Sequence, residues 1–116
     1  MKVKNIFKRW ASKKSKPDFG RIEFVESLAD VPLNPGVSIF IVSDGSKNKW
    51  VVFECPNKCG KRIEVNLMRS RYPYWTLKIK RKKISLYPSV VVQGCGAHFW
   101  LTESKVIEAK FPYEEK

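Results

Sequence analysis

The stretch VVFECPNKCGKRIEV, residues 51–65, contains two of the three cysteines of the chain, four positions apart, with a proline after the first and a glycine after the second. A second stretch, QGCGAHFWL (93–101), contains the third cysteine and the only histidine. Cysteine and histidine are the residues that most often bind structural zinc. Their confinement to two short segments, each after a predicted strand, predicts two turns that meet around one metal ion.

The spacing within each turn fits tetrahedral zinc. Three residues separate Cys55 from Cys59, and two separate Cys95 from His98, which is within the range found in zinc-binding turns. Three thiolates and one imidazole would fill every position of a Zn²⁺ ion, and a closed site of this kind stabilises a fold instead of activating water. The sequence therefore predicts one structural zinc ion.

The same residues allow two other interpretations. The cysteines could be small buried hydrophobes and His98 a core histidine with satisfied hydrogen bonds. Alternatively, Cys95 or Cys59 could be a nucleophile with His98 as its base, although the remaining cysteines would then have no role. The paired, glycine-flanked placement of all four residues favours zinc.

From residue 21 onward, the apolar pattern has the period of strands. The run VSIFIVS (37–43), the turn DGSKN and the run KWVVFE (49–54) read as a hairpin. Other predicted strands lie at 21–28, 62–68, 74–80, 84–87, 97–102 and 105–109. We therefore predict an all-β (or β-rich α+β) fold of small antiparallel sheets with a zinc-ribbon-like Cys3His site.

At 116 residues the chain is expected to form one domain. Residues 21–112 are the predicted β domain, 113–116 a C-terminal tail, and 1–20 a basic amphipathic arm and linker. Apolar residues at helical spacing in the arm predict a short helix whose stripe binds a partner: Val3, Ile6, Phe7 and Trp10. The arm lacks the apolar stretch of a signal peptide, so a cytoplasmic location is expected.

The basic charge is concentrated in two segments. The chain has 23 Lys and Arg against 11 Asp and Glu; residues 1–21 contribute +7, and residues 69–83 contain seven basic residues and no acidic one. Mixed with aromatics, the second segment could bind single-stranded nucleic acid. The candidate residues are Arg69, Arg71, Tyr72, Tyr74, Lys78, Lys80, Arg81, Lys82 and Lys83. Against this, Trp75, Leu77 and Ile79 alternate as the inward face of a strand would.

Three ordered motifs resemble those of a small, uncharacterised bacterial zinc-binding family: CPNKCG (55–60), SLYPSV (85–90) and GCGAHFWL (94–101). The resemblance covers residues 30–110 and implies that Cys55, Cys59, Cys95 and His98 bind the metal. The middle cysteine of the family is Asn57 in this chain, so we take that position not to be a ligand. Because members of the family are found beside bacterial ubiquitin-like conjugation genes, the resemblance also implies a protein partner from such a pathway and a role in phage defence.

These observations favour a non-catalytic, zinc-stabilised binding module that acts as an adaptor in ubiquitin-like conjugation. Nucleic-acid binding through residues 69–83 is the alternative. An enzyme is not expected, because Ser85 and Ser89 would have no histidine to activate them if His98 holds a metal ion. In this interpretation Pro88 forms a turn before the run of valines.

Overall fold

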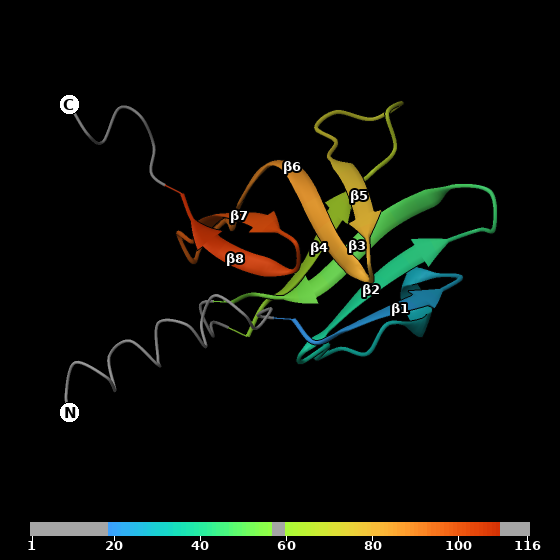
Figure 1. Ribbon diagram of the computed structural model, residues 1–116, viewed down its shortest axis with the longest axis horizontal. Helices are drawn as coiled ribbons and strands as arrows, with labels where there is room; N and C mark the ends of the chain where they lie inside the picture. Colours follow the sequence, from blue (N-terminus) through green and yellow to red (C-terminus); the bar gives the residue numbers. More distant parts are fainter. Residues whose placement is uncertain (1–18, 57–59, 110–116) are drawn as a thin grey trace.

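The computed structural model describes residues 19–56 and 60–109 (Figure 1). Three predictions lie outside the described residues: the amphipathic helix with its partner-binding stripe, the position of Cys59, and the C-terminal tail. Within the described ranges, no helix is long and apolar enough to cross a membrane.

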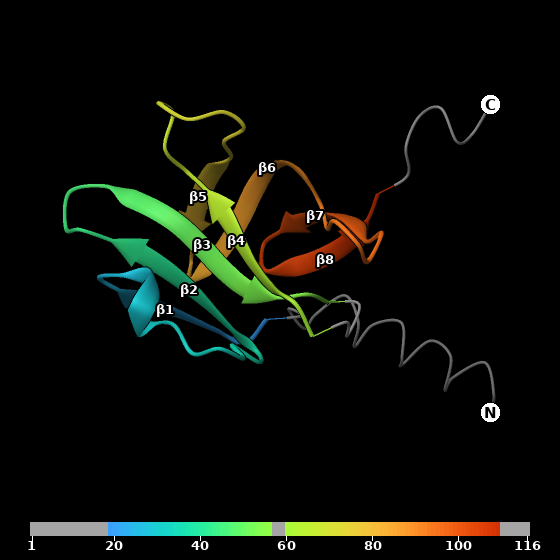
Figure 2. The same cartoon turned by 180° about the vertical axis from the view of Figure 1, so that it is seen from behind.

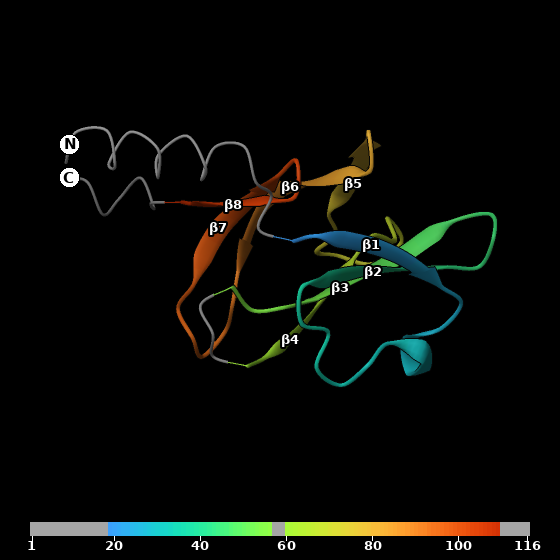
Figure 3. The same ribbon diagram turned by 60° about the horizontal axis from the view of Figure 1, so that its bottom comes forward.

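The domain consists of two four-stranded sheets that form separate layers (Figures 1, 2 and 3). The order in the first sheet is β1-β2-β3-β4 and in the second β5-β6-β7-β8. Each predicted strand segment overlaps one of these strands, so the all-β prediction is confirmed. Their bounds are β1 Arg21–Val25, β2 Ser38–Ser43, β3 Asn48–Glu54, β4 Arg62–Asn66, β5 Thr76–Lys80, β6 Lys83–Val91, β7 His98–Thr102 and β8 Lys105–Glu108.

One strand pair differs from the predicted antiparallel arrangement. Strands β1 and β2 are parallel, with Arg21 opposite Ser38 and Val25 opposite Val42. A parallel pair needs a connection long enough to return the chain to the same end of the sheet. Residues 26–37 make this connection and include a short 3-10 helix, Leu28–Asp30. All other strand pairs in the described chain are antiparallel.

The main core lies between the two sheets. Phe53 of β3 is fully buried and makes edge-to-face contacts with Phe19, at 5.4 Å between ring centroids, and with Phe99 of β7, at 6.1 Å. Such alternating inward side chains account for most of the hydrophobic stabilisation of a two-layer fold. The packing joins the sheets into one body.

The outer faces of the two sheets differ. Outward side chains of the first sheet, Phe40, Val42 and Val52, are buried in a second cluster under Val31 of the β1–β2 connection. The outward side chains of the second sheet include Tyr87 and Trp100, which are exposed. Within the described chain, the first sheet is therefore covered on both faces, and the second is covered on one.

The loop between β4 and β5 is held by Asn66. The buried Asn66 side chain donates from Nδ2 to the carbonyls of Met68, Arg71 and Pro73 at 3.2, 3.0 and 2.9 Å, and its Oδ1 accepts from the Met68 N–H. Its own carbonyl accepts the Trp75 N–H at 2.8 Å. These bonds fix the end of the loop from which the Trp75 side chain reaches the second sheet.

Candidate serine–histidine site

A bulge in the central strand β6 presents the candidate nucleophile. Leu86 lies opposite Leu101 and Val90 opposite Phe99, so β6 uses two more residues than β7 between the same two ladder positions. The extra length lies at Tyr87, Pro88 and Ser89. Bulges redirect side chains and are common beside active sites, and they tolerate proline because the local ladder is already interrupted.

The strand therefore continues through Pro88 to Val91 instead of turning there. This corrects the interpretation of Pro88 as a turn. A bulge accommodates the proline without ending the strand, and it displaces Ser89 from the regular ladder.

Ser89 lies beside the only histidine. The distance from Ser89 Oγ to His98 Nε2 is 2.8 Å, which is within hydrogen-bonding range. His98 is the first residue of β7 and lies opposite Val91. Both side chains are half-buried, and the Nδ1 atom of His98 is buried. The imidazole therefore directs Nε2 toward the serine hydroxyl, while Nδ1 is covered by protein atoms.

Trp75 holds the backbone of Ser89. The indole Nε1–H donates to the carbonyl of Ser89 at 3.1 Å, while the ring packs against the main core. A bond from a core-anchored side chain restrains the bulge at the residue that carries the hydroxyl. Through this hydrogen bond, the loop after Asn66 restrains the backbone of Ser89.

The arrangement fits that of a nucleophile with its base. A serine hydroxyl becomes a competent nucleophile when an adjacent imidazole accepts its proton, and the required heavy-atom separation is about 2.6–3.2 Å. The observed 2.8 Å lies within this range. A small cavity of about 210 Å³ adjoins His98 and is lined by Pro56, Ala97, His98, Phe99, Val106 and Glu108.

Two predicted metal ligands are brought together. The Sγ atoms of Cys55 and Cys95 lie 3.7 Å apart, which is too far for a disulfide bond between these two cysteines. Two sulfurs on one tetrahedral zinc, each at about 2.3 Å from the metal, would be about 3.8 Å apart. The thiol pair therefore fits two positions of such an ion.

The full predicted ligand set is not assembled by the described residues. In residues 19–56 and 60–109, no group of three or more Cys, His, Asp or Glu side chains is placed to hold a metal ion. Cys59 falls outside these ranges. His98 directs Nε2 to Ser89, so the predicted Cys3His site remains a prediction.

The two cysteine turns are joined by Lys61. Its Nζ donates to the carbonyl of Gln93 at 2.8 Å, and its own carbonyl accepts the N–H of Cys55 at 2.8 Å. Lys61 thus connects the segment after β3 to the turn before β7. This connection keeps the cysteine pair close to the start of the strand that carries His98.

The basic segment 69–83 does not form one surface for stacking bases. Arg69 lies over the ring of Tyr74 at 5.6 Å, Tyr72 is 91% exposed, and Trp75 is engaged with Ser89 and the core. The remaining candidates belong to a different element, the β5–β6 hairpin: Lys78, Lys80, Arg81, Lys82 and Lys83. The aromatics and most of the cations are therefore separated between a loop and a strand.

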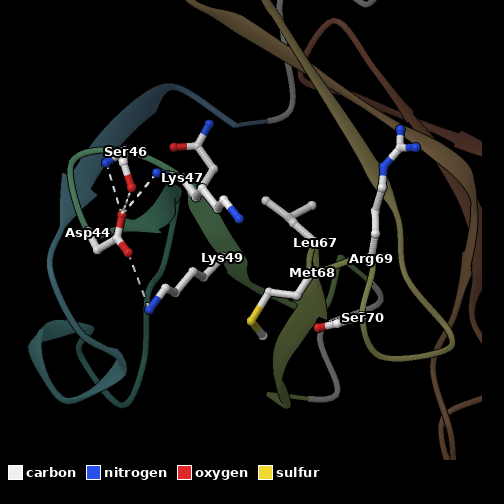
Figure 4. Close-up of a pocket in the computed structure, with 9 residues that line it drawn as sticks. Asp44, Ser46, Lys47, Lys49, Leu67, Met68, Arg69 and Ser70 are labelled. Carbon is white, nitrogen blue, oxygen red and sulfur yellow. Dashed lines mark hydrogen bonds and ion pairs between the residues drawn. The ribbon is translucent and has the colours of Figure 1, made fainter.

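A larger cleft lies between the β2–β3 turn and the loop after β4 (Figure 4). Its volume is about 760 Å³. Backbone N–H groups of Ser46 and Lys47, the Ser46 hydroxyl and the charge of Lys49 hold the pKa of Asp44 far below its usual value. Neither Ser89 nor His98 lines this cleft. The lining residues are Asp44, Ser46, Lys47, Asn48, Lys49, Leu67, Met68, Arg69 and Ser70.

Sequence reasoning missed the contact between Ser89 and His98. Each residue lies in a motif that the family resemblance uses, SLYPSV and GCGAHFWL. Assigning His98 to a metal ion removed the base that Ser89 would need. One signal could have suggested the pair: one motif of the family contains a serine, and another contains the only histidine of the chain.

One family model matches this chain over residues 24–109, and its description is bacterial ubiquitination-like system serine protease (BubE). The matched segment contains the entire second sheet and therefore both Ser89 and His98. No curated protein and no solved structure matches the chain.

This match confirms the predicted link to bacterial ubiquitin-like systems and contradicts the predicted function. The expectation of a non-catalytic adaptor is wrong, as is the expectation that the chain is not an enzyme. The alternative of a nucleic-acid-binding protein is overturned with them. The expectation of a non-enzyme rested on assigning the single histidine to a metal ion; the structure also places this histidine against a serine hydroxyl, and its role as a metal ligand stays a prediction.

Proposed function

Because the chain belongs to the family of bacterial ubiquitination-like system serine proteases, we propose that it is a serine protease with Ser89 as nucleophile and His98 as base. The observation that carries the proposal is the 2.8 Å separation of Ser89 Oγ from His98 Nε2. Two further features support it. The bulge lifts Ser89 out of the ladder, and Trp75 restrains its backbone.

The proposed reaction has two stages. In the first, Ser89 Oγ attacks the carbonyl carbon of the scissile bond while its proton passes to His98 Nε2. The tetrahedral intermediate then collapses, the bond to the leaving group breaks, and the leaving group takes the proton from His98. In the second, water attacks the acyl-serine, His98 accepts a proton from that water, and Ser89 Oγ recovers the proton as the acid product leaves.

The proposed substrate is a ubiquitin-like protein. A protease of a ubiquitination-like system can act at the carboxyl end of the modifier, either to trim it or to release it from a protein to which it is joined. Both reactions break an acyl bond whose carbonyl must approach Ser89. Ser89 and His98 are half-buried, a position that suits the carboxyl end of a modifier lying across the second sheet.

We further propose that Cys55 and Cys95 help to hold one structural Zn²⁺ ion, with Cys59 as a ligand on sequence grounds. The 3.7 Å separation of the two sulfurs supports this. When bound, the ion would supply folding free energy by joining the two turns.

His98 is left out of this proposed ligand set. A ring nitrogen bound to metal has no lone pair for a proton, and metal on Nδ1 would leave the ring proton on Nε2. Nε2 would then donate to Ser89 and could not accept its proton. The proposed base therefore requires His98 to be free of metal.

The test uses two readouts on the full chain. The first is covalent labelling by a fluorophosphonate, which reacts with activated serines. The second is cleavage of a ubiquitin-like protein of the host's own system, fused at its C-terminus to a reporter. We expect Ser89→Ala to abolish labelling and cleavage. We expect His98→Gln to lower both rates by roughly 10²–10⁴-fold, the usual contribution of a general base.

Ser85→Ala is the matched control. Ser85 lies four positions earlier on the same strand, and its hydroxyl accepts the Glu103 N–H at 2.9 Å. We expect this variant to be labelled and to cleave like the wild type. Labelling of Ser89→Ala at the wild-type rate would contradict the proposal.

A further inference from the structure

We infer that the outer face of the β5–β8 sheet docks the folded part of the protein substrate. On the substrate, the matching surface would be an apolar patch with carboxylates around it. The inference rests on the proposed function, since it concerns how the substrate reaches Ser89. We define the docking face by its apolar centre, Tyr87, Trp100 and Ile107, and by the lysines around it, Lys78, Lys80 and Lys105.

The apolar centre is exposed and ordered. The rings of Tyr87 and Trp100 stack at 5.8 Å between centroids, with an interplanar angle of 29°. Ile107 lies opposite Trp100 on the neighbouring strand. Their exposed fractions are 67%, 37% and 49%, respectively. Adjacent exposed aromatic and aliphatic side chains of this kind are typical of the centres of protein interfaces.

The docking face is continuous with the catalytic pair. Outward and inward residues alternate along β7, so His98 and Trp100 share the outer face while Phe99 and Leu101 enter the core. Ser89 follows Tyr87 in the same bulge. A substrate whose scissile carbonyl reaches Ser89 therefore has its adjoining part over Tyr87 and Trp100.

The charge at the border selects the occupant. On β5, Leu77 faces inward opposite the buried Leu86, so Lys78 and Lys80 face outward. Lys105 lies opposite Thr102 at the start of β8. Within the described strands of this sheet, no Asp or Glu occupies an outward position of the ladder. Glu103, in the turn between β7 and β8, is exposed beside Ser85 of this face. The three lysines outweigh this one carboxylate, so the border is positive and carboxylates on a partner would be attracted to it.

The same charge argues against the chain's own first segment as the occupant. Residues 1–21 carry eight basic residues and one acidic residue. A cationic segment would be repelled by the lysines at the border. A separate protein with an apolar patch and acidic surroundings fits better.

The test compares two variants of the docking face with a control. Ile107→Ala removes an apolar contact, and Lys105→Glu reverses a border charge. Phe24→Ala is the control, since Phe24 is 59% exposed on β1 of the other sheet. Each full-chain variant is assayed for kcat/KM on the ubiquitin-like protein–reporter fusion and for fluorophosphonate labelling of Ser89.

We expect both variants of the docking face to be labelled. Ile107→Ala should lose roughly tenfold in kcat/KM on the fusion, chiefly through KM, as for a central interface residue. Lys105→Glu should also lose kcat/KM, because the reversed charge repels the carboxylates of the substrate. The control should lose nothing. Labelled variants with the wild-type kcat/KM would overturn the inference and leave the proposed function intact. If the wild type is not labelled, the proposed function fails. The docking face is then tested separately by the binding of the fusion to Ser89→Ala: weaker binding after adding Ile107→Ala would support the docking face, and unchanged binding would overturn it.

One further variant tests the chain's own arm as the occupant. If Trp10→Ala raised kcat/KM while Ile107→Ala left it unchanged, the arm and not the substrate would cover this face. That result would also overturn the inference.

Discussion

Trp75 is predicted to position Ser89, the proposed nucleophile, and Trp75→Phe tests this. The substitution removes the indole N–H that donates to the Ser89 carbonyl at 3.1 Å and keeps an aromatic ring against the core. Loss of the hydrogen bond should cost about 1 kcal/mol. Loss of the indole edge from a partly buried site should cost about 1 kcal/mol more. The expected decrease in the free energy of unfolding is therefore about 2 kcal/mol, or about 10 °C in Tm for a domain of this size.

The effect on reactivity should exceed what this destabilisation explains. A loss of about 2 kcal/mol leaves a typical domain almost entirely folded at 25 °C. Without the bond, however, the bulge that carries Ser89 can move relative to His98, and a displacement of about 1 Å can cost 10²-fold in rate. We expect fluorophosphonate labelling and kcat to fall roughly ten- to a hundredfold, with KM changing little.

Trp50→Phe is the matched control for this prediction. Trp50 is also a half-buried tryptophan, but it packs in the cluster on the outer face of the first sheet. It should lose about 1 kcal/mol of stability through the smaller ring alone and keep the wild-type rate of labelling. Equal losses of labelling in the two variants, or normal labelling in Trp75→Phe, would refute a positioning role.

Two more predictions concern the metal and the loop. The full chain purified without chelator should carry one zinc ion by elemental analysis. Cys55→Ser should lose this ion together with much of its stability, because structural zinc contributes apparent free energies of about 10–16 kcal/mol. A metal-free wild type whose Tm is unchanged by chelation would contradict the site. Asn66→Asp should lower the free energy of unfolding by about 3 kcal/mol or more in urea titrations, because it replaces a donor to three carbonyls with a buried carboxylate. An unchanged urea midpoint would show that these bonds do not hold the loop.

The sequence determined the eight strands, because their signals are local. Alternating apolar residues and turn residues such as those at 44–48 act over a few positions, and every predicted segment overlaps an observed strand. The two cysteine turns were also visible locally, and the structure brings Cys55 and Cys95 together. The ordered motifs carried the link to a bacterial ubiquitin-like system, which the family match confirms.

Tertiary structure alone decided the parallel pairing of β1 with β2 and the site itself. Ser89 and His98 are nine positions apart, and they meet because β6 pairs with β7 across a bulge. A register shift of this kind depends on how two strands fit the core, with Leu86 and Val90 both facing inward. No local pattern in either strand encodes that fit, so the partner of the only histidine is set by packing between strands and not by spacing along the chain.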